Sequence, residues 1–271
     1  MLELKNIFMT FNPGTVNEKK ALEGLSLKLD TGDFATIIGS NGAGKSTMFN
    51  MITGTYFPDE GQIILDGDDI TFVREHIRSR YIGRLFQDPL MGTAPNMTIE
   101  ENLSVAYLRA SIGNRGSFSR ISKKEKEFFR EKLSLLGMGL EDRMTSPVGL
   151  LSGGQRQALT LLMATVVTPR ILLLDEHTAA LDPATADKVL ELTREVVEDR
   201  KITCMMVTHN MQQALDLGNR TLMMSDGRIV FDTAGQERAG MTVNDLLRRF
   251  AQQAGHSLSN DRILLSTEEG R

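Results

Sequence analysis

The residues from Gly39 to Ser46 form a glycine-rich loop that is suited to binding phosphate. Their sequence, Gly-Ser-Asn-Gly-Ala-Gly-Lys-Ser, satisfies the pattern G-x-x-x-x-G-K-S. Glycines allow several backbone N–H groups to face phosphate oxygens, and a following helix adds the positive end of its dipole. In such a loop Lys45 reaches the β and γ phosphates of a nucleoside triphosphate, and the Ser46 hydroxyl binds Mg²⁺. The loop therefore predicts a site for a nucleotide and a magnesium ion.

Two adjacent carboxylates, Asp175 and Glu176, follow the apolar run from Ile171 to Leu174. A buried strand would deliver both acids at its carboxyl end, where α/β proteins bind their ligands. Alone, this pattern is more typical of an ordinary buried strand that ends in solvated acids, but the phosphate loop upstream favours a role in chemistry. We assign Asp175 to Mg²⁺, generally through water, and Glu176 to polarising or deprotonating an attacking water.

A third candidate is the segment Leu151-Ser152-Gly153-Gly154-Gln155, which precedes a helical pattern over 156–167. Ser152 and Gln155 match a capping box, so the plain interpretation is the start of a helix. The two glycines also leave backbone N–H groups uncovered at the positive end of that helix. This segment is therefore a second place that could bind a phosphate.

These segments need strands and helices to position them. The apolar run Phe34 to Ile38 predicts a fully buried strand of a parallel sheet that leads into the loop, and a short helix ending at Gly54 follows. Residues 25–29 alternate like a half-exposed strand, which indicates an N-terminal β region. After residue 150 we expect strands over 171–174 and 202–207, a helix that begins at Asp182-Pro183, a hairpin at Asp226-Gly227 and a helix over 243–251.

Residues 88–150 differ from the rest of the chain because helical patterns dominate there. Thr98 with Glu101 and Ser122 with Glu125 each match a capping box, and the second begins an amphipathic pattern that ends at Gly137. We therefore expect a mainly helical insertion in this part of the chain.

Taken in order, the phosphate loop, the Leu151–Gln155 segment, the acidic pair and a downstream histidine resemble the ATP-binding cassette of ABC transporters, over about residues 2–235. The Leu151–Gln155 signature distinguishes this family from others, since phosphate loops also occur in many other ATPases and GTPases. The resemblance implies an α/β fold with a P-loop NTPase (RecA-like) core, an N-terminal antiparallel β subdomain and an inserted α-helical subdomain. It implies an ATP-binding domain over 1–235, with the helical subdomain at 88–150, and a C-terminal helix and polar tail over 236–271.

The resemblance also assigns roles to residues. Gln87 would sense Mg²⁺ and the γ-phosphate, and His209 would contact the γ-phosphate and hold the attacking water, so both join Glu176 as catalytic residues. Phe11 would stack on adenine, with Phe8 as a weaker competitor. The metal is expected at Ser46, Gln87 and Asp175. The residues expected to bind ATP are Phe11, Gly39, Ser40, Asn41, Gly42, Ala43, Gly44, Lys45, Ser46, Thr47, Ser152, Gly153, Gly154, Gln155 and Asp182.

One departure from the family pattern is His177, which follows the catalytic glutamate where many cassettes carry proline. No family role is inherited at this position. A structural histidine is therefore favoured over a catalytic one.

Composition excludes several kinds of partner. The net charge of −4 gives no general attraction to polyanions, so we expect no nucleic-acid partner. The single cysteine, Cys204, lies in a strand-like run and fits a reducing compartment. Charges within residues 1–6 argue against an export signal, and the most apolar helical pattern, 158–167, is about half the length of a membrane span. Any membrane role therefore needs a partner.

The resemblance implies how the protein would work. Two copies would pack head to tail, with each ATP between Lys45 of one copy and Ser152 of the other. ATP hydrolysis would drive an integral membrane permease at the cytoplasmic face of the membrane, served indirectly by an extracytoplasmic solute-binding protein. Phe11-Asn12-Pro13-Gly14-Thr15 and Lys19-Lys20-Ala21-Leu22 look like a bacterial subgroup that takes up aromatic or other amino acids.

Alternatives stay open at this point. The chain could serve an exporter, although a stand-alone cassette favours import, or it could be a soluble ABC ATPase that drives a non-transport assembly. A translation-type protein usually joins two cassettes, and a chromosome ATPase would carry a long coiled coil between its motifs. GTP is disfavoured because the sequence has no Asn-Lys-x-Asp element.

Overall fold

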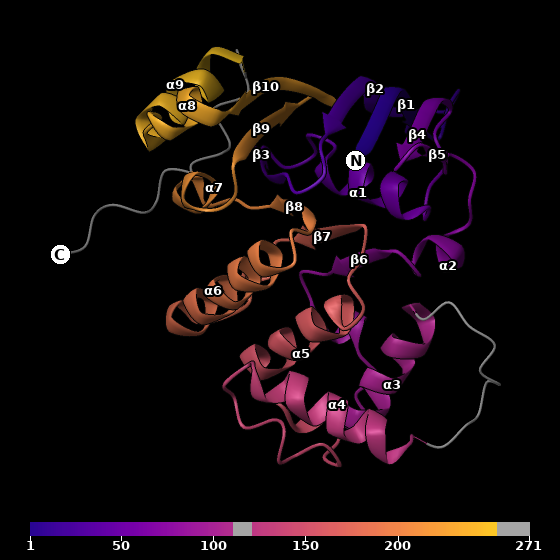
Figure 1. The fold of residues 1–271 in the computed structure, drawn as a ribbon. Helices are drawn as coiled ribbons and strands as arrows, with labels where there is room; N and C mark the ends of the chain where they lie inside the picture. The colour runs from indigo at the N-terminus through magenta and orange to yellow at the C-terminus, as the bar shows by residue number, and fades with distance from the viewer. Residues whose placement is uncertain (111–120, 254–271) are drawn as a thin grey trace. The chain divides into compact units, whose positions relative to one another are not determined.

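The computed structural model describes residues 1–110 and 121–253, which belong to two compact units. The first unit combines Met1–Arg78 with the chain from Thr203 onward, and the second unit is Ser79–Ile202. Each unit has its own sheet strands and its own helices (Figure 1). The polar tail expected beyond the last helix lies outside the described residues.

The first unit begins with an antiparallel sheet whose strand order is β2-β1-β4-β5. Leu25, Leu27 and Leu29 of β2 are buried while the residues between them are exposed, so the alternation seen in the sequence is confirmed. The first strand was not predicted as such. Pairing places Leu2 opposite Leu29 at one end of the sheet and Phe11 opposite Lys19 at the other. The strands are β1 (Leu2–Phe11), β2 (Lys19–Leu29), β4 (Glu60–Leu65) and β5 (Asp68–Asp69).

The first unit also holds four strands in the order β10-β9-β3-β8. Strand β3 is parallel to both of its neighbours, and all of its residues are buried, as its apolar sequence predicted. The hairpin expected at Asp226-Gly227 joins β9 to β10. The strands are β3 (Phe34–Gly39), β8 (Thr203–Val207), β9 (Arg220–Ser225) and β10 (Arg228–Ala234), and the helices of this unit are α1 (Lys45–Thr53), α2 (Glu75–Arg78), α7 (Met211–Asp216), α8 (Gly235–Ala239) and α9 (Val243–Gln253).

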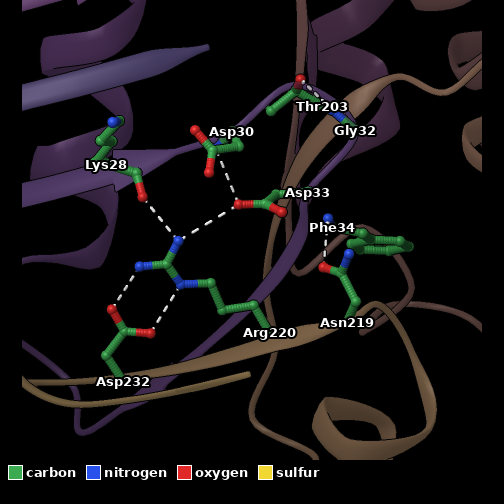
Figure 2. A network of polar contacts seen from close by, with 9 residues as sticks. All are labelled: Lys28, Asp30, Gly32, Asp33, Phe34, Thr203, Asn219, Arg220 and Asp232. Atoms are coloured by element: carbon green, nitrogen blue, oxygen red, sulfur yellow. Dashed lines mark hydrogen bonds and ion pairs between the residues drawn. The ribbon is translucent and has the colours of Figure 1, made fainter. Parts of the chain in front are cut away.

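A polar network lies at the end of these strands where β3, β8 and β9 begin (Figure 2). The Arg220 guanidinium donates to both carboxylate oxygens of Asp232, at 2.8 and 2.6 Å, and to the Lys28 carbonyl at 2.7 Å. It also lies 3.4 Å from the Asp33 carboxylate. The hydrogen bond with Asp232 raises the pKa of Arg220. One arginine thus joins the β9–β10 hairpin to β2 and to the turn before β3.

The second unit contains two parallel strands and a cluster of helices. Strands β6 and β7 pair from Ile82 opposite Ile171 to Leu85 opposite Leu174. Helices α3, α4 and α5 pack around a common apolar core that includes Leu103, Phe129 and Leu159. The elements are β6 (Ile82–Leu85), η1 (Pro89–Gly92), α3 (Ile99–Ala110), α4 (Lys123–Ser134), η2 (Val148–Leu150), α5 (Gly153–Thr165), β7 (Ile171–Asp175) and α6 (Pro183–Asp199).

The helix starts predicted from capping patterns are confirmed. The Thr98 hydroxyl accepts from the Glu101 N–H while the Glu101 carboxylate accepts from the Thr98 N–H, and Ser122 with Glu125 forms the same reciprocal pair. The second helix ends at Ser134 rather than continuing to Gly137. In the described part of the chain, no helix is both long and apolar enough to cross a bilayer.

Arg78 is fully buried and ties the end of α1 to the following loop. Its guanidinium donates to the carbonyls of Met51 and Ile52 in α1, at 2.8 and 2.9 Å, and to those of Thr71 and Val73, at 2.8 and 2.7 Å. Carbonyls in the last turn of a helix have no partner within the helix. Arg78 therefore satisfies the free end of the helix that follows the phosphate loop.

Replacing Arg78 tests this role. Arg78→Leu removes a donor from four carbonyls, of which that of Met51 keeps a second donor in the Gly54 N–H, so we expect it to lower the free energy of unfolding by about 3 kcal/mol. Urea denaturation measures the loss. Arg80→Leu, at an exposed position, is the control and should change it by less than about 0.5 kcal/mol. Equal stability of the two variants would contradict the role.

Candidate nucleotide site

Backbone geometry in the phosphate loop requires glycine at two packed positions. Gly39 ends β3 against the Met224 carbonyl, which a Cβ on Gly39 would strike. Gly44 precedes α1 with φ +102°, in the left-handed region, and a Cβ there would lie 2.7 Å from the Ala21 carbonyl oxygen. The loop can therefore adopt this path only without side chains at both positions.

The side chain of Lys45, the first residue of α1, folds back onto the preceding loop. Its side chain is 6% exposed, and Nζ donates to the carbonyls of Gly39 at 2.6 Å and Ser40 at 2.9 Å. Ser46 is exposed in the first turn of α1. An ammonium, a hydroxyl and the positive end of a helix therefore converge on one loop, which is the chemistry that binds phosphate.

The first unit brings His209 to the same sheet edge as the phosphate loop. Val207, at the end of β8, pairs with Ile37 of the parallel strand β3, and the Thr208 N–H donates to the Ile37 carbonyl at 3.1 Å. His209 is exposed just beyond that point. Parallel strands end at a common edge, so the predicted γ-phosphate contact and the loop occur together within this unit.

Phe11 ends β1 and is partly buried. The Tyr56 ring meets it edge to face, with 5.4 Å between ring centroids. Such a contact fixes the orientation of the Phe11 ring. Phe8 lies three residues earlier on the same strand, opposite Glu23.

Asp175 lies at the end of β7, as predicted, and is paired with an arginine that sequence reasoning missed. Arg84 Nη2 is 3.7 Å from Asp175 Oδ2, and the two side chains are only 14% and 16% exposed. Arg84 also stacks over the Phe86 ring at 4.6 Å. Strand β6 delivers Arg84 to this place and leads directly to Gln87, which is exposed.

Glu176 has φ +45°, an unusual left-handed conformation for a residue with a side chain. Its carbonyl accepts from the Ala179 N–H at 3.0 Å, so the chain turns sharply after the strand. Backbone strain of this kind persists where the surrounding structure holds it in place.

His177 anchors this turn to α6. Its side chain is buried, and Nε2 lies 3.2 Å from the Thr193 hydroxyl. That hydroxyl donates to the Val189 carbonyl at 2.7 Å, so it accepts from the imidazole N–H. Burial lowers the pKa of His177 to about 4, which keeps the ring neutral at pH 7. The structural interpretation of this histidine fits its burial.

The signature segment begins α5 as its sequence predicted. The Ser152 hydroxyl accepts from the Gln155 N–H, and the Gln155 side chain accepts from the Ser152 N–H, both at 3.2 Å. Gly154 lies against the Thr185 methyl group in the first turn of α6, and a Cβ on Gly154 would collide with it. Asp182 caps that helix by accepting from the Thr185 N–H at 3.1 Å. Gly154 therefore lets the starts of α5 and α6 approach closely.

Comparison with known proteins agrees with these motifs. The profile of the family described as "ABC transporter" matches residues 22–179. The chain belongs to this family. It is an ATP-binding cassette that hydrolyses ATP, with the α/β fold of P-loop NTPases.

Two relatives are similar over most of their length. The "Tyrosine transport ATP-binding protein" of Clostridioides difficile (strain R20291) is 42% identical over 251 residues, which cover 92% of this cassette and 98% of the relative. The phosphonates import ATP-binding protein PhnC of Treponema denticola is 33% identical over 235 residues, which cover 86% of this cassette and 89% of the relative.

Solved cassettes share the fold. The dimeric ATP-binding cassette MJ0796 bound to ADP and Pi is 29% identical, with a TM-score of 0.73 over 86% of this cassette and 98% of that chain. The ADP conformation of the ABC transporter cassette MJ1267 is 27% identical, with a TM-score of 0.74 over 92% of this cassette and 94% of that chain.

The contact between Gly154 and Thr185 yields a test by compensation. Gly154→Ala should lower the free energy of unfolding by about 1–3 kcal/mol, because the new methyl group meets that of Thr185. Thr185→Ser removes this methyl group and keeps the backbone donor. The double variant should therefore recover most of the loss in urea denaturation. A double variant as unstable as Gly154→Ala would contradict the contact.

Proposed function

We propose that this cassette is the ATP-hydrolysing subunit of a bacterial importer of an amino acid or a similar small solute. The observation that carries the proposal is the 42% identity with a tyrosine transport ATP-binding protein across almost the whole of both chains. Relatives named for methionine import support an amino acid further, at 32% and 33% identity. Relatives named for phosphonate and sugar import match less closely, at 33% and 31%.

The nucleotide would bind to the phosphate loop of the first unit. Lys45 would neutralise charge on the β and γ phosphates, and the exposed face of the Phe11 ring would stack on adenine. The backbone N–H groups of the loop, with Thr47 in the first turn of α1, would hold the remaining phosphate oxygens. His209, at the same sheet edge, would contact the γ-phosphate.

Magnesium fits the oxygen donors in these motifs. Ser46 supplies a hydroxyl, Asp175 a carboxylate and Gln87 an amide oxygen, and hard cations such as Mg²⁺ prefer oxygen. Among the described residues, no group of three or more His, Cys, Asp or Glu side chains could hold a metal. A site completed by phosphate oxygens and water suits Mg²⁺, which neutralises charge on the phosphates when bound.

Glu176 would act on the attacking water. It would accept a proton as the water oxygen bonds to the γ-phosphorus and the bond to ADP breaks. The turn after β7, anchored by His177 and Thr193, would hold this carboxylate in position. Arg84, 3.7 Å from the Asp175 carboxylate, would help to orient it.

Two copies would bind ATP between them. Ser152 to Gln155 cap a helix start whose N–H groups suit phosphate, and they belong to the second unit, whereas the phosphate loop belongs to the first. The similar cassette MJ0796 is dimeric, which supports a head-to-tail pair. Hydrolysis and phosphate release would remove the bridge and open the pair.

A cleft of about 130 Å³ in the second unit would receive a short helix of the membrane permease. It is lined by Phe86, Met91 and Met163 together with two arginines, Arg84 and Arg109. Met91 is 70% exposed and would be available to an apolar side chain of that helix. The cassette would thereby sit at the cytoplasmic face of the membrane, with a solute-binding protein acting on the permease from the other side.

Glu176→Gln tests the catalytic assignment. The amide keeps the size of the side chain and cannot accept the proton, so kcat for ATP hydrolysis should fall about 10²- to 10⁴-fold. ATP affinity should be retained, and an ATP-bound dimer should accumulate on a sizing column. Glu191→Gln, at an exposed position on α6, is the control. Hydrolysis at the normal rate would exclude Glu176 as the base.

The transport role is tested by capturing partners of this trapped variant. Tagged Glu176→Gln, incubated with Mg-ATP in solubilised native membranes, should retain a polytopic membrane protein, identified by mass spectrometry. The solute-binding protein associated with that permease would then identify the substrate. Recovery of soluble or ribosomal partners alone would instead support an ABC ATPase that drives another assembly.

A further inference from the structure

We propose that Lys19 is a second phosphate-binding cation of the nucleotide site and contacts the α-phosphate, the one next to the ribose. The proposal rests on the proposed function in one respect, namely that adenine stacks on Phe11 while the phosphates occupy the loop. It adds a residue that lies outside the phosphate loop, the signature segment and the acidic pair, and to which no role in nucleotide binding is assigned above. Three features of the first unit support it.

Strand pairing places Lys19 beside the adenine position. Lys19 begins β2 and pairs with Phe11 at the end of β1. Residues directly opposite each other in an antiparallel pair share one face of the sheet. The next residue, Lys20, pairs with Thr10 and therefore projects to the other face. Only the first of these two lysines is on the side of the Phe11 ring.

The Lys19 side chain reaches the phosphate loop. A Cβ placed on Gly42 would lie 3.5 Å from Lys19 Nζ, within van der Waals contact. Gly42 is exposed, has φ +84° and carries no side chain, so nothing of its own separates the ammonium from the loop backbone. Lys19 thus extends from the strand position opposite Phe11 to the middle of the loop.

Lys45 and Lys19 occupy different places around the phosphate loop. Lys45 is buried and donates to the carbonyls of Gly39 and Ser40 inside the loop. Lys19 is exposed at its outer side, and within residues 1–110 and 121–253 its ammonium has no hydrogen bond or ion pair. An ammonium so placed is available to an anion. A nucleotide that extends from Phe11 into the loop would pass it at the α-phosphate.

The alternative is that Lys19 is an ordinary solvated surface lysine. The effect of Lys19 on nucleotide affinity separates these cases, and it also shows which phosphate the ammonium contacts. ADP and ATP share the α-phosphate, so a cation there should contribute equally to both, whereas a cation at the γ-phosphate should favour ATP alone. A surface charge that acts only through net charge should be matched by its neighbour Lys20.

The experiment compares the full-length protein with Lys19→Gln, Lys19→Arg and, as the matched control, Lys20→Gln. The dissociation constants of Mg-ADP and of a non-hydrolysable Mg-ATP analogue are measured by titration calorimetry. Lys19→Gln should weaken both nucleotides by about 3- to 10-fold and by the same factor. Lys19→Arg should bind nearly as the parent does, and Lys20→Gln should change neither constant by more than about twofold. Raising the salt concentration should reduce the effect of Lys19→Gln.

Three results would overturn the proposal. Unchanged affinity in Lys19→Gln would make Lys19 a solvated lysine, and an equal loss in Lys20→Gln would assign the effect to net charge. Weakening of the ATP analogue without weakening of ADP would place the ammonium at the γ-phosphate. If the unmodified protein bound neither nucleotide, the proposed function itself would fail, which separates that failure from a failure of the Lys19 assignment.

Discussion

The central physical constraint in this protein is that backbone must approach backbone without side chains between them. Phosphate binding by N–H groups demands a bare loop, and the same glycines that expose those groups also pack the loop into the fold. Gly39 lies against the carbonyl of Met224, and Gly44 lies against that of Ala21. The signature segment has a related constraint, since Gly154 lies against the side-chain methyl group of Thr185 and leaves no room for a Cβ. The residues proposed to bind phosphate therefore also make close packing contacts.

Helix α1 shows how charge supports this arrangement. At its start Lys45 donates to two loop carbonyls. At its end the buried Arg78 donates to the carbonyls of Met51 and Ile52. The positive end of the helix remains directed at the loop, while the carbonyls of its last turn are satisfied. Both cations are almost or fully buried, and each is compensated by carbonyl dipoles.

The acidic pair, which we propose acts in hydrolysis, is held by a second set of contacts, in the other unit. The carboxylate of Asp175 is paired with Arg84, and the turn that carries Glu176 is anchored through His177 to α6. A neutral imidazole suits this position, because burial in an apolar surrounding disfavours the charged form of His177. The first unit has the phosphate loop and His209, and the second unit has the acidic pair and the signature.

The sequence alone determined the features that depend on neighbouring residues. The phosphate loop, the capping boxes at Ser122 and Ser152, the buried strand before the loop and the hairpin at Asp226-Gly227 are local, and each occurs where its pattern predicted. The order of the motifs was enough to identify the family.

Only the tertiary structure decided which distant residues meet. Arg84 and Asp175 are brought together by the register of two parallel strands, and Arg78 meets α1 only because the chain folds back over it. Lys19 reaches Gly42 through the pairing of β1 with β2. Such contacts depend on strand register and on packing between segments far apart in the chain, for which a single sequence contains no local pattern.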